Sequence, residues 1–108
     1  MIWAIVQFEF EGVHWWDKAK DFLKNPHRHM FKVKVMVEQF HDDRDIEYIN
    51  FKRELTTKFG GYLEGPFSCE TMARRIYDYV RKTTKYKGTN RVCKVYVMED
   101  GENGAMIE

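Results

Sequence analysis

Apolar and polar residues alternate along two segments of the first 40 residues. Over residues 2–11 the even positions are apolar and the later odd positions are polar, which is the period of a strand with one buried face. Residues 31–37 alternate in the same way and form the clearest predicted strand. Trp3 and Ile5 are apolar on the opposite face of the first strand, which leads to the hypothesis that another subunit covers this face.

Two later segments have a helical period. Between residues 48 and 59, Phe51, Leu55 and Phe59 recur every four residues and two glycines follow, so we predict a short amphipathic helix. Ser68 is suited to be the N-cap of a second helix that ends near residues 82–85. The apolar stripe of this helix consists of Met72, Ala73, Ile76, Tyr77 and Val80.

The remaining segments have the composition of turns, loops and short strands. We predict a loop with a helical turn over residues 12–26, a solvated turn over 41–45 and a connection over 60–66. Residues 92–98 are predicted to form a strand that ends at Glu99, and residues 105–108 a short final strand. This order of elements predicts an α+β fold with a four-stranded antiparallel sheet and both helices on one face.

Length and charge narrow the class of protein. A chain of 108 residues with 44% hydrophobic residues fits one domain, residues 1–108, although so small a domain is often stabilised by oligomerisation. The 18 basic and 17 acidic residues leave a formal net charge of +1, which gives no field suited to nonspecific binding of nucleic acids or membranes. We therefore expect neither of these partners.

Cysteine use and the amino-terminal residues bear on the compartment. Cys69 and Cys93 form no closely spaced pair, which argues against a disulfide framework or a cysteine-based zinc cluster and favours a reducing cytoplasm. The first residues lack a basic leader and reach Glu9 and Glu11 early, so they are predicted to form a strand rather than a signal peptide or a membrane span.

Three histidines are the strongest candidates for chemistry. His27 and His29 are two residues apart on an extended segment, so they project to one side, roughly 6.6 Å apart along the backbone. His14 shares the parity of the apolar face of the first strand, and pairing of the two segments would bring it alongside. Three imidazoles would make a zinc site with one open position. The alternative is three unrelated histidines, one of them a hydrogen-bonded core residue.

Five segments together resemble the family of 6-pyruvoyl-tetrahydropterin synthase and 6-carboxy-tetrahydropterin synthase, whose subunits have the tunnelling fold, or T-fold. The segments are residues 8–14, His27-Arg28-His29 with the aromatic strand after it, residues 48–51, residues 67–70 and residues 98–100. The resemblance implies a zinc ion on His14, His27 and His29, and a pterin held by Glu99. It also implies a ring-like homo-oligomer, commonly a hexamer, and a place in a queuosine or biopterin pathway.

The chain departs from the family pattern in the residues that transfer protons. The family usually has a cysteine shortly before the paired histidines, but residues 21–26 contain no thiol. The family also has an Asp-His pair between the two helices, but residues 60–65 contain no histidine. Asn50 stands where the family often has aspartate, and Arg28 stands in place of glycine between the histidines.

Two glutamates are candidates for binding a ligand. Glu99 ends a largely apolar row, where a carboxylate is costly to bury unless it is paired. A pterin or purine presents adjacent ring N–H and NH₂ donors that a carboxylate can accept in pairs. The simpler alternative is that Glu99 begins a solvated turn. Glu70 either complements the dipole of the second helix or makes a second ligand contact.

Proton transfer has only weak candidates in the sequence. Asp21, Glu64 and His41 could replace the missing base, although none has compelling spacing, and Cys69 is expected to be a structural residue rather than a nucleophile. Trp15 and Trp16 could stack on a flat heterocycle, but are first taken as interface candidates.

Three functions remain open from the sequence. The first is a tetrahydropterin synthase-like carbon-oxygen lyase that acts on dihydroneopterin triphosphate or a related pterin with an unconventional base. The second is a non-catalytic T-fold protein that binds or sequesters a pterin, purine or nucleotide. The third is a structural oligomer with a vestigial site.

Overall fold

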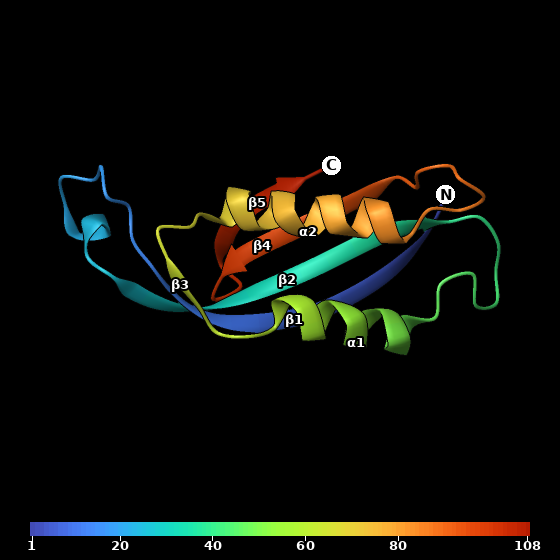
Figure 1. The fold of residues 1–108 in the computed structure, drawn as a ribbon, viewed down its shortest axis with the longest axis horizontal. Coiled ribbons are helices and arrows are strands. Elements are labelled where there is room, and N and C mark those ends of the chain that lie inside the picture. The colour runs from blue at the N-terminus through green and yellow to red at the C-terminus, as the bar shows by residue number, and fades with distance from the viewer.

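Two long strands, β1 (Ile2–His14) and β2 (His27–Gln39), form the centre of the fold. The structure is a computed structural model that describes residues 1–108. The two strands pair antiparallel along their whole length, with Ile2 opposite Gln39 and His14 opposite His27. β4 (Cys93–Glu99) pairs with the other side of β2, and β5 (Asn103–Ile107) pairs with β4, both antiparallel. Figure 1 shows these strands running along the long axis of an elongated molecule of 49 by 21 by 21 Å.

A fifth strand corrects the predicted sheet. The α+β class is confirmed, but the sheet is mixed and has the order β3-β1-β2-β4-β5 instead of four antiparallel strands. The added strand β3 (Leu63–Gly65) lies in the predicted connection and pairs parallel with the end of β1. Its backbone thereby gives the last residues of β1 a partner on their open side, a contact that no side-chain pattern could reveal.

The end of β1 also differs from the prediction of a loop from residue 12 onward. Gly12 pairs with His29 in β2 and with Leu63 in β3, so backbone pairing on both sides extends the strand to His14 in spite of the glycine. The loop therefore covers residues 15–26 and contains the predicted helical turn as the 3₁₀ helix η1 (Phe22–Lys24).

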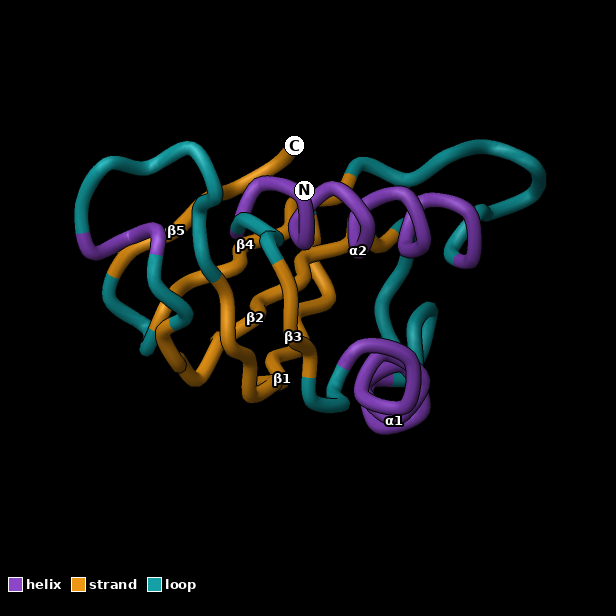
Figure 2. The backbone as a smooth tube through the Cα atoms, turned by 60° about the vertical axis from the view of Figure 1, so that its left-hand side comes forward, coloured by secondary structure: helices purple, strands orange, loops and turns teal.

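The two predicted helices are confirmed as α1 (Tyr48–Phe59) and α2 (Cys69–Thr83). The Ser68 side chain caps α2 by accepting a hydrogen bond from the backbone N–H of Thr71, as an N-cap serine does. Both helices pack against the same face of the sheet, because their buried residues join one core with the inward residues of the strands. Figure 2 shows both helices to one side of the strands.

The buried rows of the strands run toward one end of the sheet and end in polar residues. On β1 the buried row is Ala4, Val6, Phe8 and Phe10, and His14 continues it after Gly12. The rows on β2 and β4 likewise lead to His29 and to Glu99. Polar side chains from three strands are thereby brought to one end of the core.

The second face of the sheet carries no helix of this chain. Ile5 is 49% exposed there, which leaves the hypothesis of a covering subunit untested. Neither helix combines the length and the apolar composition that crossing a membrane would require.

Candidate metal centre

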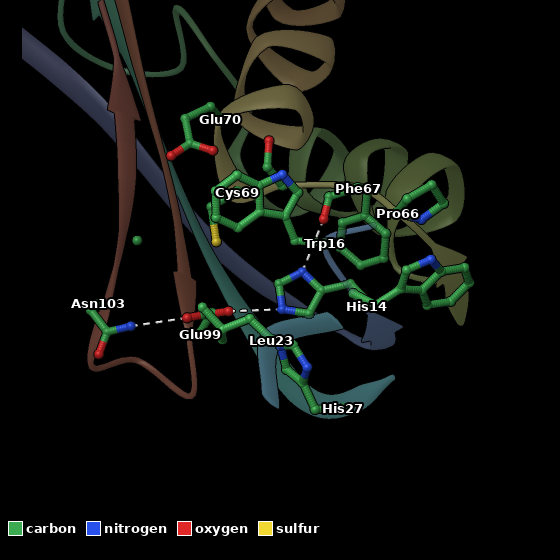
Figure 3. Close-up of a pocket in the computed structure, with 13 residues that line it drawn as sticks. His14, Trp16, Leu23, His27, Pro66, Phe67, Cys69, Glu70, Glu99 and Asn103 are labelled. Atoms are coloured by element: carbon green, nitrogen blue, oxygen red, sulfur yellow. Dashed lines mark hydrogen bonds and ion pairs between the residues drawn. The ribbon is translucent and has the colours of Figure 1, made fainter. Parts of the chain in front are cut away.

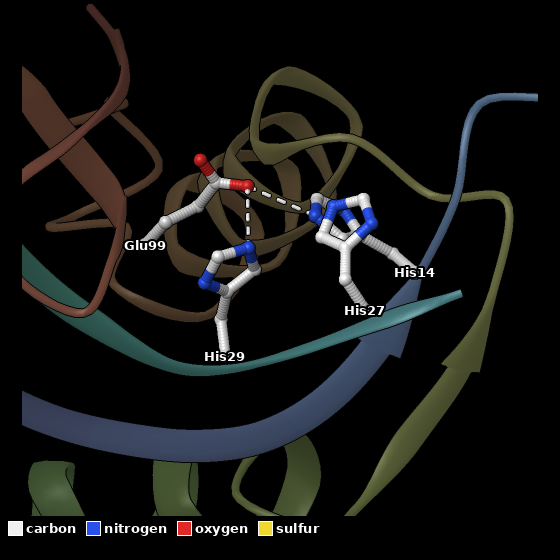
Figure 4. A group of neighbouring side chains, drawn as sticks. All are labelled: His14, His27, His29 and Glu99. Carbon is white, nitrogen blue, oxygen red and sulfur yellow. Dashed lines mark ion pairs between the residues drawn. The ribbon is translucent and has the colours of Figure 1, made fainter. Parts of the chain in front are cut away.

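The three histidines meet at the end of the sheet through the register of β1 and β2. His14 lies directly opposite His27, and Gly12 lies opposite His29, so all three imidazoles project from one face. Their ring centroids are 4.5 to 5.3 Å apart. Glu99 joins them because β4 places it opposite Phe31, two residues beyond His29. One ligand atom from each of these four side chains lies within 4.8 Å of the others, and Figure 4 shows the group.

Each imidazole has its Nδ1 atom beside an oxygen that can only accept a hydrogen bond. The pairs are His14 with the carbonyl oxygen of Phe67 at 2.9 Å, His27 with the carbonyl oxygen of Asn25 at 2.8 Å, and His29 with Oδ2 of Asp100 at 2.7 Å. Each Nδ1 must therefore carry the proton and donate it, which leaves the Nε2 atom of the neutral ring with a free lone pair. Fixing the tautomer in this way is typical of histidines that bind metals.

The donor atoms fit a metal ion. The Nε2 atom of His14 is buried and has no hydrogen-bond partner. Oε2 of Glu99 lies 2.9 Å from this atom and 3.4 Å from Nε2 of His29, so a carboxylate faces two lone pairs. A proton on an Nε2 atom makes such a contact favourable, and so does a metal ion held between the nitrogen and the carboxylate. Three imidazole nitrogens and a carboxylate oxygen form a donor set that could hold a divalent ion and is common for zinc.

Asp100 is a functional candidate that the sequence reasoning missed, because it lies in a stretch with strong turn composition. Its Oδ2 accepts the Nδ1 proton of His29, and its Oδ1 accepts the backbone N–H of Met30. The hydrogen bond from His29, together with that from Met30, lowers the pKa of Asp100. The residue immediately after Glu99 thus orients one of the histidines.

A cavity of about 670 Å³ opens beside the histidines (Figure 3). It is lined by His14, Trp15, Trp16, Leu23, His27, Pro66, Phe67, Ser68, Cys69, Glu70, Glu99, Asn103 and Gly104. Glu70 and Glu99 are the only carboxylic side chains that line it, and no lysine or arginine lines it. The cavity therefore combines flat aromatic surface with hydrogen-bond acceptors and suits a planar ligand that has N–H donors.

Glu99 has a second contact inside this cavity. Its Oε1 accepts a hydrogen bond of 3.0 Å from the side-chain amide of Asn103, while Oε2 faces the histidines. Asn103 begins β5 on the far side of the turn, and its amide holds the carboxylate in one orientation. Glu99 therefore lies both at the candidate metal site and at the wall of the cavity.

The thiol of Cys69 lines the cavity but is not a nucleophile at neutral pH. Burial, followed by the carboxylates of Glu99 and Glu70, raises the pKa of Cys69 to about 12. The thiol is therefore protonated under physiological conditions, when the reactive form would be the thiolate.

The three replacement bases considered from the sequence do not line the cavity. Asp21 accepts the backbone N–H of Leu23 as the cap of η1, and Glu64 accepts a hydrogen bond from Tyr62. His41 lies just past the far end of β2, about 40 Å from His27 along the extended chain. None of these three candidate bases therefore lines the cavity beside the histidines.

Two departures from the family pattern have clear positions. Arg28 points to the opposite face from His27 and His29 and pairs with Glu11 at 3.1 Å, so it does not enter the cluster. Asn50 lies in the first turn of α1, where its backbone N–H is capped by Glu47, and it does not line the cavity.

The fold and the cluster define an α+β protein with a candidate metal site of three histidines and one glutamate. No protein-family model matches the chain, and no curated protein matches it. These comparisons do not test the resemblance to the tetrahydropterin synthase family, which stays a prediction from the sequence motifs.

Proposed function

We propose that this chain is a zinc-binding T-fold protein of the 6-pyruvoyl/6-carboxy-tetrahydropterin synthase type that binds dihydroneopterin triphosphate or a related pterin. One observation carries the proposal: three Nε2 lone pairs converge with the Glu99 carboxylate at the wall of a cavity of about 670 Å³. One metal ion could bind all of these donor atoms together, which supports the proposal.

The residues have distinct roles in this proposal. His14, His27 and His29 hold the zinc ion, which when bound supplies a Lewis acid that polarises a hydroxyl or carbonyl group of the ligand. Glu99 accepts hydrogen bonds from the ring N–H and NH₂ groups of the pterin. Glu70, exposed in the first turn of α2, offers a second carboxylate on the same wall.

Aromatic side chains complete the proposed binding site. Trp15, Trp16 and Phe67 all line the cavity, and Trp16 is 60% exposed. An exposed indole at a cavity mouth can stack on a flat ring, so a ligand contact is proposed here together with the interface role.

The second candidate function is binding without catalysis. It is favoured by the contents of the cavity, where the Cys69 thiol is protonated and where Asp21, Glu64 and His41 are absent. A lyase of this type needs a positioned base, which typically contributes about 10²- to 10⁴-fold to the rate. A T-fold protein that binds or sequesters a pterin, purine or nucleotide does not need one.

Assembly and location complete the proposal. We propose a homo-oligomer, a ring-like hexamer as the family resemblance implies, because the sheet face that carries Trp3 and Ile5 is open in the single chain. Both cysteines are free and buried, which suits a reducing cytoplasm. Native mass spectrometry of the zinc-loaded protein would test the assembly.

One experiment tests the function and separates its two forms. Zinc-loaded protein is incubated with dihydroneopterin triphosphate while product formation and binding are followed in parallel. Turnover supports the lyase, and tight binding without turnover supports the non-catalytic protein. If the protein shows neither binding nor turnover, the proposal is refuted. Metal analysis should find about one zinc per subunit, none in the His14, His27 and His29 triple alanine variant, and full loading in the distant His41→Ala control.

A further inference from the structure

The position of Glu99 raises a question that the three-histidine site leaves open. Its Oε2 atom is 2.9 Å from Nε2 of His14 and 3.4 Å from Nε2 of His29. In the neutral rings both nitrogens have a lone pair, because the Nδ1 protons are donated to Phe67 and Asp100. The carboxylate therefore belongs to the same acceptor cluster as the imidazoles.

The separation of these atoms suits a shared ion. Two ligand atoms bound to one tetrahedral zinc at about 2.0 to 2.1 Å lie about 3.3 Å apart, close to the 3.4 Å between Glu99 and His29. The 2.9 Å between Glu99 and His14 is shorter, so this contact has to lengthen by about 0.4 Å when an ion binds. The Asn103 amide holds the other carboxylate oxygen at 3.0 Å, which leaves a single oxygen of Glu99 for the ion.

From this geometry we infer that Glu99 is a fourth metal ligand, which closes the coordination sphere while the cavity holds no organic ligand. The inference rests on the proposed metal site. It means that without an organic ligand this site has four protein ligands instead of three. Four protein ligands make a closed site, whereas three leave a position for a reactant.

Closure by Glu99 has a direct consequence for recognition. A heterocycle whose N–H and NH₂ groups bind Glu99 requires the same carboxylate oxygens that hold the metal and Asn103. Binding of a ring with this donor edge therefore withdraws Glu99 from the ion and opens the coordination position. A ligand without the donor edge leaves the site closed.

Zinc and cobalt binding test the inference without any enzyme assay. Glu99→Gln keeps the shape of the side chain and removes its charge, and is expected to weaken zinc affinity at least about ten-fold in competition with a chelator. Glu70→Gln removes the same charge from the same cavity outside the cluster and should change zinc affinity less than about two-fold.

Cobalt in place of zinc reports the open position through its visible absorption. Azide should leave the Co²⁺ spectrum of the wild-type protein unchanged and shift that of Glu99→Gln, since only the variant has a free position. Neopterin, whose binding is measured separately by calorimetry, should change the wild-type Co²⁺ spectrum, because its binding replaces Glu99 as a ligand.

The outcomes distinguish this inference from the proposed function. Unchanged zinc affinity in Glu99→Gln, or azide binding to wild-type Co²⁺ protein without neopterin, overturns the role of Glu99 as a ligand. Bound neopterin that leaves the Co²⁺ spectrum unchanged overturns the displacement. Zinc retained at full affinity in His14→Ala would instead refute the metal site itself.

Discussion

His29 donates its Nδ1 proton to Asp100 across 2.7 Å, and Asp100 follows Glu99 directly in the chain. The backbone of Asp100 is left-handed, with φ of 54°, and its N–H donates to the carbonyl oxygen of Met30. One turn residue thus connects the β2 histidine with the glutamate of β4. The orientation of the His29 ring depends on this aspartate.

Asp100→Asn should weaken zinc binding by about 10- to 100-fold. Asparagine tolerates the left-handed backbone, so the turn should persist. With its oxygen still on the Met30 N–H, however, the amide nitrogen faces His29 and favours the tautomer that has a proton on Nε2. Chelator competition measures the change, and Glu102→Gln in the same turn serves as the control. Equal affinity of Asp100→Asn and wild type would rule out this positioning role.

Gly12→Ala should destabilise the protein by about 1–3 kcal/mol and weaken metal binding. A Cβ atom at Gly12 would lie 2.9 Å from the Phe31 ring, 3.0 Å from the Phe67 ring and 3.1 Å from the carbonyl oxygen of Leu63. Phe67 also supplies the carbonyl that orients His14, so the displacement reaches the metal site. Urea unfolding and zinc titration provide the two measurements.

Gly61→Ala is the matched control for this substitution. A Cβ atom at Gly61 has no neighbour within 4 Å. Its stability should stay within about 0.5 kcal/mol of wild type. If both alanine variants lose the same stability, crowding at Gly12 is not the cause.

Cys69 should react slowly with iodoacetamide at pH 8 in the folded, metal-free protein. A pKa of about 12 leaves a thiolate fraction on the order of 10⁻⁴, against roughly a quarter for an ordinary thiol. The alkylation rate of Cys69 is measured by mass spectrometry in a Cys93→Ala background. It should be at least about 100-fold lower in the folded protein than in urea. Glu99→Gln should increase the rate, because the Glu99 carboxylate is the second cause of the raised pKa.

The Asp45–Arg91 pair should make stability depend on acid pH. Arg91 Nη1 donates to Asp45 at 2.8 Å, and the Arg91 and Asp45 side chains are 5% and 2% exposed. The hydrogen bond from Arg91 lowers the pKa of Asp45 below its value in the unfolded chain. The stabilisation is therefore fully present above about pH 4 and is lost as the pH falls from there toward the folded-state value.

Asp45→Asn tests this pair, because it leaves Arg91 buried without its charge partner. We expect a loss of about 3 kcal/mol at pH 7 in urea unfolding and a smaller difference from wild type at pH 2. Asp42→Asn, exposed in the same turn, should change little at either pH. A difference between Asp45→Asn and wild type that does not shrink in acid would contradict the depressed pKa.

Removal of the phosphates should not weaken binding of the pterin to a single subunit. The cavity contains Glu70 and Glu99 and lacks lysine and arginine, so a triphosphate meets like charge. Dihydroneopterin should bind at least as tightly as its triphosphate in calorimetry at low salt. Stronger binding of the triphosphate would mean that cations from outside this cavity contribute to the site.

Strand periodicity predicted that the histidines share the parity of the buried rows, whereas the extension of β1 to His14 depends on its pairing with β2 and β3. The parity of His14 with Phe8 and Phe10, and of His29 with Phe31, follows from the two-residue period, and the burial of these rows confirms it. The helices were equally predictable, since Ser68 and the apolar spacing determine a cap and a stripe.

The remaining features depend on contacts that leave no periodic signal. β3 pairs through three backbone residues inside a glycine-rich connection, and two histidines are oriented by carbonyl oxygens, which every residue possesses. Asp100 was interpreted as a turn residue because the pairing of β2 with β4, which brings it to His29, joins positions 71 residues apart. Composition cannot encode such a pairing.

The four candidate ligands come from the ends of β1, β2 and β4, which are adjacent in the sheet. An ion held there ties together three strand ends that otherwise separate independently when that end of the sheet frays. Zinc binding would therefore add its free energy to folding, raising Tm with metal concentration and slowing amide exchange near His14 more than near Ile2. The atoms that recognise a ligand would then also stabilise this end of the sheet against fraying.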